Sequence, residues 1–320
     1  MVSPGRPPWF VLADEFSWQG WRHEGAQRIR PPRRLAHRRS WRRWLHRPEA
    51  YQPELVLIES AWEGFRRLDD RFTLPVSLAR ALRAAGVPVI FWNKEDPLHF
   101  ERFLPIAQAS DIVLTSDAAC IGRYREAGCR GPVEVLTFPV QPTIHRQYLP
   151  KDEAHPVFFA GTWRPHHSER QQGFRDLILP ALDHGLHIFS RRGEWPLECR
   201  PRIVGSFPYL ELLVRTSAYP IALSISSVKD SPTMFPRRVV EMVMANILVI
   251  SDRCRAIGEL FPEIPQSDGP ARTHELIAHF RQRPGERQAI VDAVKARLFR
   301  ESTYEKQYFR LRDLARGPRG

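Results

Sequence analysis

Short, continuously apolar runs alternate with segments of helical periodicity along most of the chain. In the first half, strands are expected at residues 10–13, 55–59, 87–92, 112–115 and 133–137, and helices at 74–85, 100–109 and 117–127. The expected strands are apolar throughout rather than alternating, which is typical of strands whose two faces are both covered by helices. The pattern therefore predicts a doubly wound α/β domain built on a parallel sheet.

The pattern breaks once and then starts again. Residues 139–156 contain four prolines and little periodicity, so we interpret residues 143–156 as a linker. Further strands are expected at 157–160, 186–190, 221–224 and 247–251, helices at 168–184, 209–216 and 236–245, and a mostly helical tail from residue 271. The chain is thus predicted to form two doubly wound Rossmann-like domains facing a cleft, at residues 1–142 and 157–300. Residues 301–320 are expected to form a C-terminal helix that packs back on the N-terminal domain.

The apolar runs are too short for a membrane protein. No segment approaches the roughly 18 apolar residues needed to cross a bilayer, and WFVLA near the start is too short for a signal-peptide core. The four cysteines form no CxxC pair and no metal-like spacing, as expected for buried or free thiols in a reducing compartment. We therefore expect a soluble, cytoplasmic protein.

Positive charge is concentrated near the N-terminus. The net charge is +12, and much of the excess lies in RIRPPRRLAHRRSWRRWLHR, from Arg28 to Arg47. This arm could meet nucleic acid, acidic lipid headgroups at a membrane, or a phosphate-bearing acceptor, and the interleaved Trp41 and Trp44 could stack on the bases of single strands. It could equally be a solvated loop, so both interpretations stay open.

Several common site motifs are missing. The chain has no G-x-G-x-x-G after a strand and no Walker A loop, which disfavours dinucleotide oxidoreductases and P-loop phosphoryl transfer. H-E-x-x-H and G-x-S-x-G are also missing. His166 and His167 are adjacent but have no third ligand nearby in the sequence. We therefore expect no metal site and no cofactor.

An anion site is predicted in the second domain, within SPTMFPRRVVEMVMANILVISD. Pro236 suits the first position of a helix, which would put Arg237 and Arg238 in the first turn. Cations there are disfavoured by the helix dipole, so the pair suggests that an anion such as phosphate is expected. Glu241 lies on the same face and could accept hydrogen bonds from sugar hydroxyls. The alternative is an ordinary Arg–Glu pair on a solvated helix face.

Other candidate residues follow strands, where parallel sheets bind their ligands. Gly161 ends the first strand of the second domain and would let a ligand approach the backbone. In the first domain, a carboxylate cluster is expected to supply a general base or to bind sugar hydroxyls; its members are Glu59, Glu95 and Asp96. The polar and aromatic residues around that cluster are candidate acceptor contacts, namely Trp62, Asn93, Lys94 and His99. Surface ion pairs would be the alternative.

The motifs together resemble one family. VLIESAWEG, VIFWNKEDPLHF, VLTSDAACIGRYREAG, VFFAGTW and SPTMFPRRVVEMVMANILVIS follow one another in the order found in bacterial glycosyltransferases related to the spore maturation protein CgeB. The resemblance implies the two-domain GT-B fold, with the donor in the C-terminal domain and the acceptor in the N-terminal domain. It implies that Glu241 contacts the donor's ribose, places Ser231 and Thr233 on the donor side, and implies no obligatory metal.

These observations lead to one functional hypothesis and two alternatives. The chain is expected to transfer a sugar from a nucleoside-diphosphate-sugar donor to an unknown glycan, lipid-linked or small-molecule acceptor, with retention of anomeric configuration by analogy. Catalysis would rest on positioning and on stabilising the departing diphosphate, with Arg237 and Arg238 as the anion clamp and Gly161 lining the diphosphate. One alternative is a non-catalytic protein that binds nucleic acid or an anionic surface on a degenerate scaffold. The other is an epimerase or phosphorylase.

Overall fold

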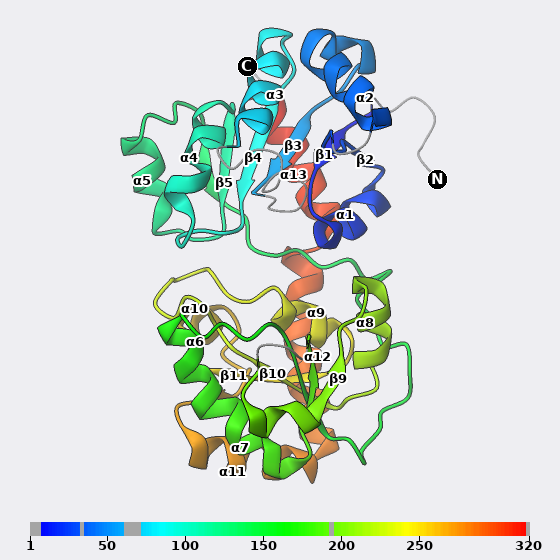
Figure 1. Cartoon of the computed structure of the whole chain (residues 1–320), viewed down its shortest axis with the longest axis vertical. Helices are drawn as coiled ribbons and strands as arrows, with labels where there is room; N and C mark the ends of the chain where they lie inside the picture. The colour runs from blue at the N-terminus through cyan, green and yellow to red at the C-terminus, as the bar shows by residue number, and fades with distance from the viewer. Residues whose placement is uncertain (1–7, 33–34, 61–71, 192–194, 318–320) are drawn as a thin grey trace. The chain divides into compact units, whose positions relative to one another are not determined.

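The computed structural model describes residues 8–32, 35–60, 72–191 and 195–317. Contacts within the chain divide it into two compact units (Figure 1). The N-terminal unit comprises Met1–Thr137 together with Tyr304–Gly320, and the C-terminal unit comprises Phe138–Thr303. Within these described ranges, each unit contains a six-stranded sheet whose neighbouring strands pair in parallel.

The N-terminal unit has its sheet in the order β2-β1-β3-β4-β5-β6. The strands are β1 (Phe10–Leu12), β2 (Gln27–Arg28), β3 (Val56–Glu59), β4 (Val89–Asn93), β5 (Ile112–Thr115) and β6 (Val133–Val135). The helices are α1 (Glu15–Trp21), α2 (Leu35–His46), α3 (Thr73–Ala84), α4 (Phe100–Gln108), α5 (Cys120–Glu126) and α13 (Tyr304–Arg316). Because the strand order reverses between β1 and β3, a crevice is expected at their carboxyl ends.

The C-terminal unit has the strand order β12-β11-β10-β7-β8-β9. Its strands are β7 (Val157–Ala160), β8 (His187–Phe189), β9 (Ile203–Gly205), β10 (Ile221–Ser224), β11 (Leu248–Asp252) and β12 (Gln266–Ser267). Its helices are α6 (Ser168–Gly173), α7 (Leu179–Ala181), α8 (Tyr209–Thr216), α9 (Arg238–Met244), α10 (Arg255–Leu260), α11 (Pro270–Arg281) and α12 (Pro284–Glu301). A π-helical turn, Phe174–Ile178, joins α6 to α7. The order reverses between β7 and β10, and the predicted fold class of two doubly wound Rossmann-like domains is confirmed.

The side-chain environments of the cysteines agree with the expectation from the sequence. All four cysteines are free and buried, so they contribute apolar volume to the interior. Within the part of the chain that the structure describes, no helix is both long and apolar enough to span a bilayer.

The arginine-rich arm forms a helix that covers part of the core. In α2, Trp41 and Trp44 lie three residues apart on one face and are 3% and 2% exposed. Trp44 stacks on Tyr51 with ring centroids 4.0 Å apart and meets Phe10 edge-on. The prediction that these tryptophans could stack on single-stranded bases is therefore wrong, because an apolar residue repeated at helical spacing is buried against the sheet.

The segment expected to be a linker is an integral part of the C-terminal unit. The amino group of Lys151 donates hydrogen bonds to the carbonyls of Ser217, Tyr219 and Ala245 at 2.9, 3.0 and 3.2 Å. Two of those carbonyls lie where α8 and α9 end and have no partner within the helix. Residues 143–156 lack regular structure, as the prolines predicted, but polar contacts attach them to the unit.

The last helix returns to the N-terminal unit, in red among its blue and cyan elements in Figure 1. Tyr304 meets Trp21 edge-on with ring centroids 4.5 Å apart, and Tyr308 packs on Trp9 at 4.9 Å. These four aromatic side chains are nearly or fully buried. Gly20 in α1 makes room for the contact, because a Cβ atom there would lie 2.1 Å from the Tyr304 ring.

Replacing Gly20 by alanine should therefore destabilise the N-terminal unit. Crowding against a buried ring costs about 1–3 kcal/mol, more than the roughly 1 kcal/mol that alanine gains over glycine in a helix. Chemical denaturation would measure the change. Gly122→Ala in α5 is the matched control, since a Cβ there meets no atom within 4 Å and should be neutral or stabilising. Equal stabilisation by both changes would contradict the proposed packing.

Candidate functional site

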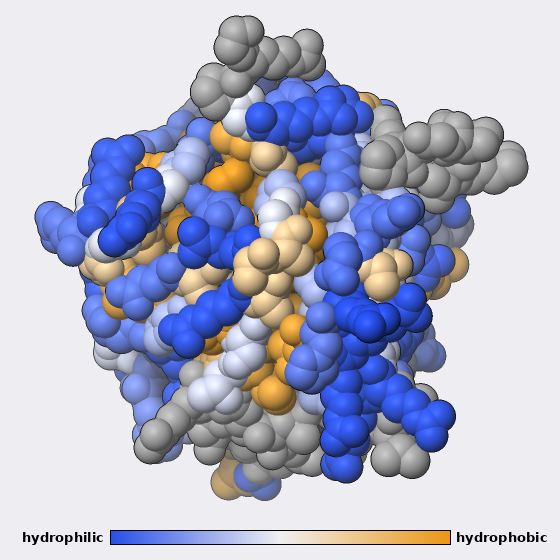
Figure 2. Space-filling model, turned by 90° about the horizontal axis from the view of Figure 1, so that it is seen from above, coloured by the Kyte–Doolittle hydropathy of each residue, from blue (hydrophilic) through white to orange (hydrophobic). Residues whose placement is uncertain are grey.

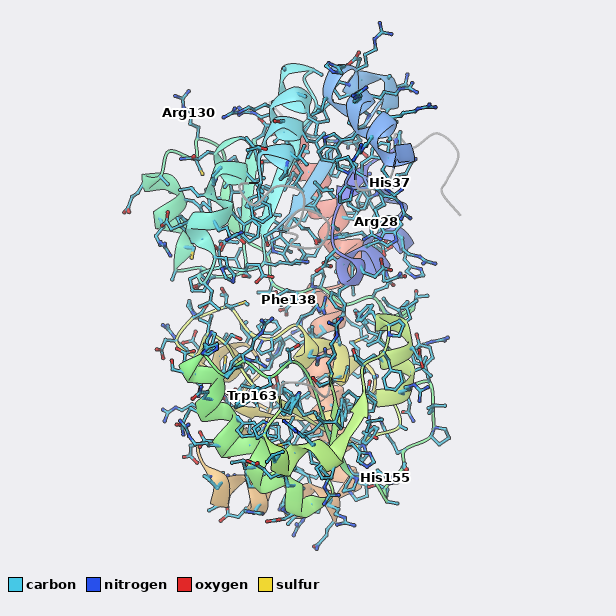
Figure 3. The ribbon with its side chains drawn as sticks, viewed as in Figure 1. Arg28, His37, Arg130, Phe138, His155 and Trp163 are labelled. Carbon is cyan, nitrogen blue, oxygen red and sulfur yellow. The ribbon has the colours of Figure 1, made fainter. Side chains whose placement is uncertain are left out.

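The C-terminal unit gathers charged side chains at the reversal point between β7 and β10. Gly161 directly follows β7, and its amide donates to the carbonyl of Phe189 at 3.2 Å. A Cβ at this position would lie 2.6 Å from the Phe159 ring, so the close approach requires glycine. The following loop is anchored by Trp163, which packs on Phe174 and Trp195 with ring centroids 4.4 and 5.9 Å apart (Figure 3).

Arg170, which was not predicted, ties together the loops that follow β7 and β10. Its guanidinium donates to the Thr162 carbonyl at 3.1 Å, to the Ile225 carbonyl at 3.4 Å and to the Ser227 hydroxyl at 3.3 Å. Its pKa is lowered by burial and by the nearby charges of Arg164 and Arg238. The clue in the sequence was its place in the first turn of a helix after Gly161, but its distant partners, the Ile225 carbonyl and the Ser227 hydroxyl, carry no local signal.

Arg238 is the first residue of α9. Its pKa is lowered by burial and by the charge of Arg237, against the opposing effect of Glu241. Among the described residues, neither Arg238 nor Arg170 forms an ion pair with a carboxylate. The charge of Arg238 contributes to lowering the pKa of Arg170. Two half-buried guanidinium groups without a direct carboxylate contact among the described residues form an arrangement that favours an anionic ligand.

Arg237 and Glu241 form the intrahelical ion pair that the sequence analysis considered as the alternative to a ligand site. Nε of Arg237 lies 3.0 Å from Oε1 of Glu241, one helical turn away. The pair is not solvated, however, because Glu241 is fully buried. The helix also begins at Arg238, two residues later than the predicted start at Pro236, so Arg237 is the N-cap residue.

Only one of the two carboxylate oxygens of Glu241 has polar contacts among the described residues. Oε1 accepts a hydrogen bond of 2.5 Å from the Tyr209 hydroxyl and lies 3.8 Å from Nε2 of His145. Oε2 is buried and has no hydrogen-bond partner among the described residues. Burial opposes ionisation of Glu241, but the charges of Arg237 and Arg238 and the nearby His145 together lower its pKa. The result is an ionised, buried carboxylate with one unsatisfied oxygen, which is costly unless a ligand donates to it.

His145 and Tyr209 complete this arrangement, and sequence reasoning missed both. His145 is 2% exposed; its Nδ1 accepts from the backbone N–H of Gln141 at 3.0 Å, and its Nε2 lies 2.8 Å from the Tyr209 hydroxyl. Burial lowers the pKa of His145 to about 4, so the ring is neutral. His145 lies in the segment predicted to be a linker, and only the fold brings it to Glu241.

The remaining predicted donor residues shape the loop after β10. The buried hydroxyl of Ser231 accepts from the amides of Met234 at 2.9 Å and Thr233 at 3.3 Å. Such a turn fixes the path of the backbone into α9. These residues lie in one continuous segment after β10, and Gly161 directly follows the adjacent strand β7; the segment contains Ser231, Thr233, Arg237, Arg238 and Glu241.

In the N-terminal unit, Lys94 is the centre of a buried ionic cluster. Its amino group donates to Asp14 at 2.6 Å, to Glu59 at 2.9 Å and to the Ser17 hydroxyl at 3.2 Å. Glu59 also accepts from the indole N–H of Trp21 at 3.1 Å. Burial raises the pKa of Glu59 despite the Lys94 charge. All three donors of the Lys94 ammonium group are engaged inside the unit, across the carboxyl ends of β1, β3 and β4.

A second buried network surrounds Asp96. The carboxylate accepts from Thr115 at 2.6 Å, from the amide of Asn93 at 2.7 Å and from the Tyr124 hydroxyl at 2.9 Å. Burial raises the pKa of Asp96 to about 7, although the hydrogen bonds from Thr115 and Tyr124 act in the opposite direction. Asn93 and Asp96 thus bind each other rather than project outward.

The other predicted acceptor-side residues differ in their surroundings. Glu95 is half-buried, and no described residue donates a hydrogen bond to its carboxylate. His99 immediately precedes α4. Trp62 lies outside the described residues. In the described ranges, no three His, Cys, Asp or Glu side chains come together as metal ligands would.

Comparisons with known proteins agree with this architecture. Residues 170–313 match a family model described as glycosyl transferase-like. A structure of Anabaena Alr3699/HepE in complex with UDP is similar at 13% identity and a TM-score of 0.57, covering 94% of this chain and 90% of that one. TarM is similar at 8% identity and 0.56, with coverage of 85% and 57%. The GtfA/B complex is similar at 12% and 0.52, with coverage of 82% and 58%. No curated protein matches the chain.

The likeness to solved structures at these identities establishes the fold alone, which is the two-domain GT-B type. Together with the matched segment, which contains Arg170, Tyr209, Arg238 and Glu241, it supports a glycosyltransferase. Neither finding distinguishes the CgeB-related subfamily from other members of this fold.

The environment of Asp96 predicts a specific dependence of stability on pH. Because its pKa is about 7 in the folded protein and about 4 in an unfolded chain, stabilisation by the protonated form is complete below pH 4. That stabilisation is lost as the pH rises toward 7, by on the order of 4 kcal/mol. Unfolding free energies of the wild type and Asp96→Asn should therefore diverge across this range, to the disadvantage of the wild type. Parallel pH profiles would contradict the shifted pKa.

Proposed function

We propose that the protein is a glycosyltransferase that uses a nucleoside-diphosphate sugar as donor. The observation that supports this most directly is that, among the described residues, unpaired positive groups and an unsatisfied carboxylate oxygen lie together at the β7–β10 reversal point. Arg170 and Arg238 lack a carboxylate partner, whereas Oε2 of Glu241 lacks a hydrogen-bond donor in the described structure. A nucleoside diphosphate could satisfy both groups, since its anionic phosphates can pair with the arginines and its ribose hydroxyls can donate to Glu241.

The donor site needs no metal in this proposal. Arg170, Arg237 and Arg238 neutralise the diphosphate, Gly161 allows it to approach the backbone, and Glu241 accepts from the ribose. Transfer breaks the bond between the anomeric carbon and the diphosphate oxygen and forms a bond to the acceptor oxygen, so charge develops on the departing diphosphate. Guanidinium groups already fixed around that charge lower the barrier without reorganising. Free nucleoside diphosphate as product distinguishes this reaction from epimerisation.

On the acceptor side, Glu95 is the proposed base. Glu59 pairs with Lys94 and Asp96 with Asn93 in the interior, and we assign these four residues to shaping the edge of the sheet. Glu95 is exposed enough to take a proton from an acceptor hydroxyl, while His99 and Trp62 remain proposed acceptor contacts. Retention of anomeric configuration and membership of the CgeB-related subfamily belong to this proposal as well.

The exposed face of α2 adds a second element, namely attachment to an anionic membrane. Four exposed arginines lie on α2 and a fifth directly follows it, and within the described structure none forms an ion pair with a carboxylate; they are Arg38, Arg39, Arg42, Arg43 and Arg47. Figure 2 shows hydrophilic residues interspersed with apolar ones on the face it presents, and His37, near the start of α2, is labelled in Figure 3. Clustered basic residues on an amphipathic helix favour acidic lipid headgroups. Burial of Trp41 and Trp44 removes the stacking platform that single-stranded nucleic acid would use.

Nucleotide binding is the first test of the donor site. UDP, GDP and ADP would be tested by thermal shift in a buffer with EDTA. At least one should stabilise the wild type, and Glu241→Ala should weaken that stabilisation, because the unfolding equilibrium shifts with occupancy. UDP is the natural first probe, since the similar HepE structure contains it.

The control for this test removes a carboxylate elsewhere in the same unit. Glu275→Ala breaks an exposed pair with Arg272 and should leave the nucleotide shift unchanged. Absence of a shift with every nucleotide, or a shift that requires added divalent metal, would contradict the proposed donor site.

Membrane attachment predicts binding that depends on lipid charge. Replacing Arg39, Arg42 and Arg43 together by alanine should weaken binding to phosphatidylglycerol vesicles on the order of 100-fold, at about 1 kcal/mol per arginine. Vesicle co-sedimentation would measure it. The matched control removes three exposed arginines from other elements of the same unit, at Arg80, Arg125 and Arg130. Equal loss in both variants, or stronger binding to duplex DNA than to vesicles, would contradict the proposal.

A further inference from the structure

The chain of hydrogen bonds behind Glu241 has only one possible direction. A backbone N–H can only donate, so Nδ1 of His145 must accept from Gln141. A neutral imidazole that accepts at Nδ1 carries its proton on Nε2, which then donates to the Tyr209 hydroxyl 2.8 Å away. The Tyr209 proton is thereby directed at Oε1 of Glu241, 2.5 Å away.

The neutral state of His145 is supported by its burial. The imidazole is 2% exposed. Burial, together with the positive charge of Arg237, lowers the pKa of His145 to about 4 despite the opposing charge of Glu241. A charged ring would donate from both nitrogens and would face the Gln141 N–H with a second donor. The structure therefore requires the tautomer with the proton on Nε2.

We propose that His145 and Tyr209 are positioning residues that occupy Oε1 of Glu241 and so leave Oε2 as the only oxygen available to the ribose of a bound nucleotide. This inference rests on the proposed donor site and deepens it. Tyr209 and Arg237 both contact Oε1, whereas no described residue donates to Oε2. A single fixed acceptor with no competing donor distinguishes a ribose, which offers two adjacent hydroxyls, from its 2′-deoxy form, which offers one.

The same unit contains a natural control for this relay, meaning the chain of hydrogen bonds from His145 through Tyr209 to Glu241. His187 and Tyr219 form another histidine–tyrosine pair, with Nδ1 of His187 lying 2.7 Å from the Tyr219 hydroxyl. That pair lies at the opposite edge of the sheet, where β8 and β10 begin. Tyr219→Phe thus removes the same hydroxyl from the same kind of pair without touching Glu241.

Ligand binding tests whether Tyr209 acts through Glu241. The probe is whichever of UDP, GDP and ADP binds the wild type. Tyr209→Phe should weaken its binding about tenfold and reduce the preference for the ribonucleotide over the 2′-deoxynucleotide. In the Glu241→Gln background the same change should have no further effect, because a residue that acts only through Glu241 is non-additive with it. Tyr219→Phe should leave both quantities unchanged. Additive effects of Tyr209→Phe and Glu241→Gln would overturn the proposal.

A measurement without ligand separates the positioning pair from the donor site. ¹⁵N NMR of labelled histidine at neutral pH should show His145 as the neutral tautomer protonated at Nε2, and Tyr209→Phe should shift its Nε2 resonance. A proton on Nδ1, or on both nitrogens, would overturn the relay whether or not nucleotide binds. If the expected tautomer is found but no nucleotide binds the wild type, the hydrogen-bond chain is correct but the proposed donor site is wrong. The assignment of a ribose as the partner of Glu241 is then wrong as well.

Discussion

The need to satisfy buried polar groups at the carboxyl ends of parallel strands shapes both units of this protein. A carboxylate removed from water is tolerated only where donors surround it. In the N-terminal unit, Glu59 and Asp96 each accept several hydrogen bonds from neighbouring side chains. In the C-terminal unit, Glu241 is as deeply buried but has one oxygen unsatisfied within the described residues. The two buried carboxylates of the N-terminal unit are thus satisfied by neighbouring side chains, whereas Glu241 keeps one acceptor oxygen without a donor among the described residues.

The polar stretch NKEDP illustrates how far sequence reasoning reaches. Its position after a central strand was predictable, because apolar runs and helical periodicity are local properties that survive folding. The direction in which each side chain points was not, since it depends on partners far along the chain. Asn93, Lys94 and Asp96 turn inward to Tyr124, Glu59 and Thr115, and only Glu95 stays open.

The same limit explains the other omissions. The short strands β2, β9 and β12 contain two or three residues, too few to show periodicity. His145 sits in a proline-rich segment that resembles a linker, and Arg170 donates to the Ile225 carbonyl and the Ser227 hydroxyl, both more than fifty residues away. The fold class and the Arg237–Glu241 segment came from patterns within one element. The relay and the arginine cluster are assembled from separate elements, so a single sequence gave no signal for them.

The return of the last helix affects how the protein is made. The C-terminal unit is one uninterrupted segment, Phe138–Thr303, whereas the N-terminal unit is completed by Tyr304–Gly320. During synthesis, domains fold as their residues emerge from the ribosome. The N-terminal unit, which emerges first, therefore cannot be completed until Tyr304–Gly320 has been made, and until then Trp9 and Trp21 lack their contacts with Tyr308 and Tyr304. All residues of the C-terminal unit are available before the last helix of the N-terminal unit, so the unit that begins second can be completed first.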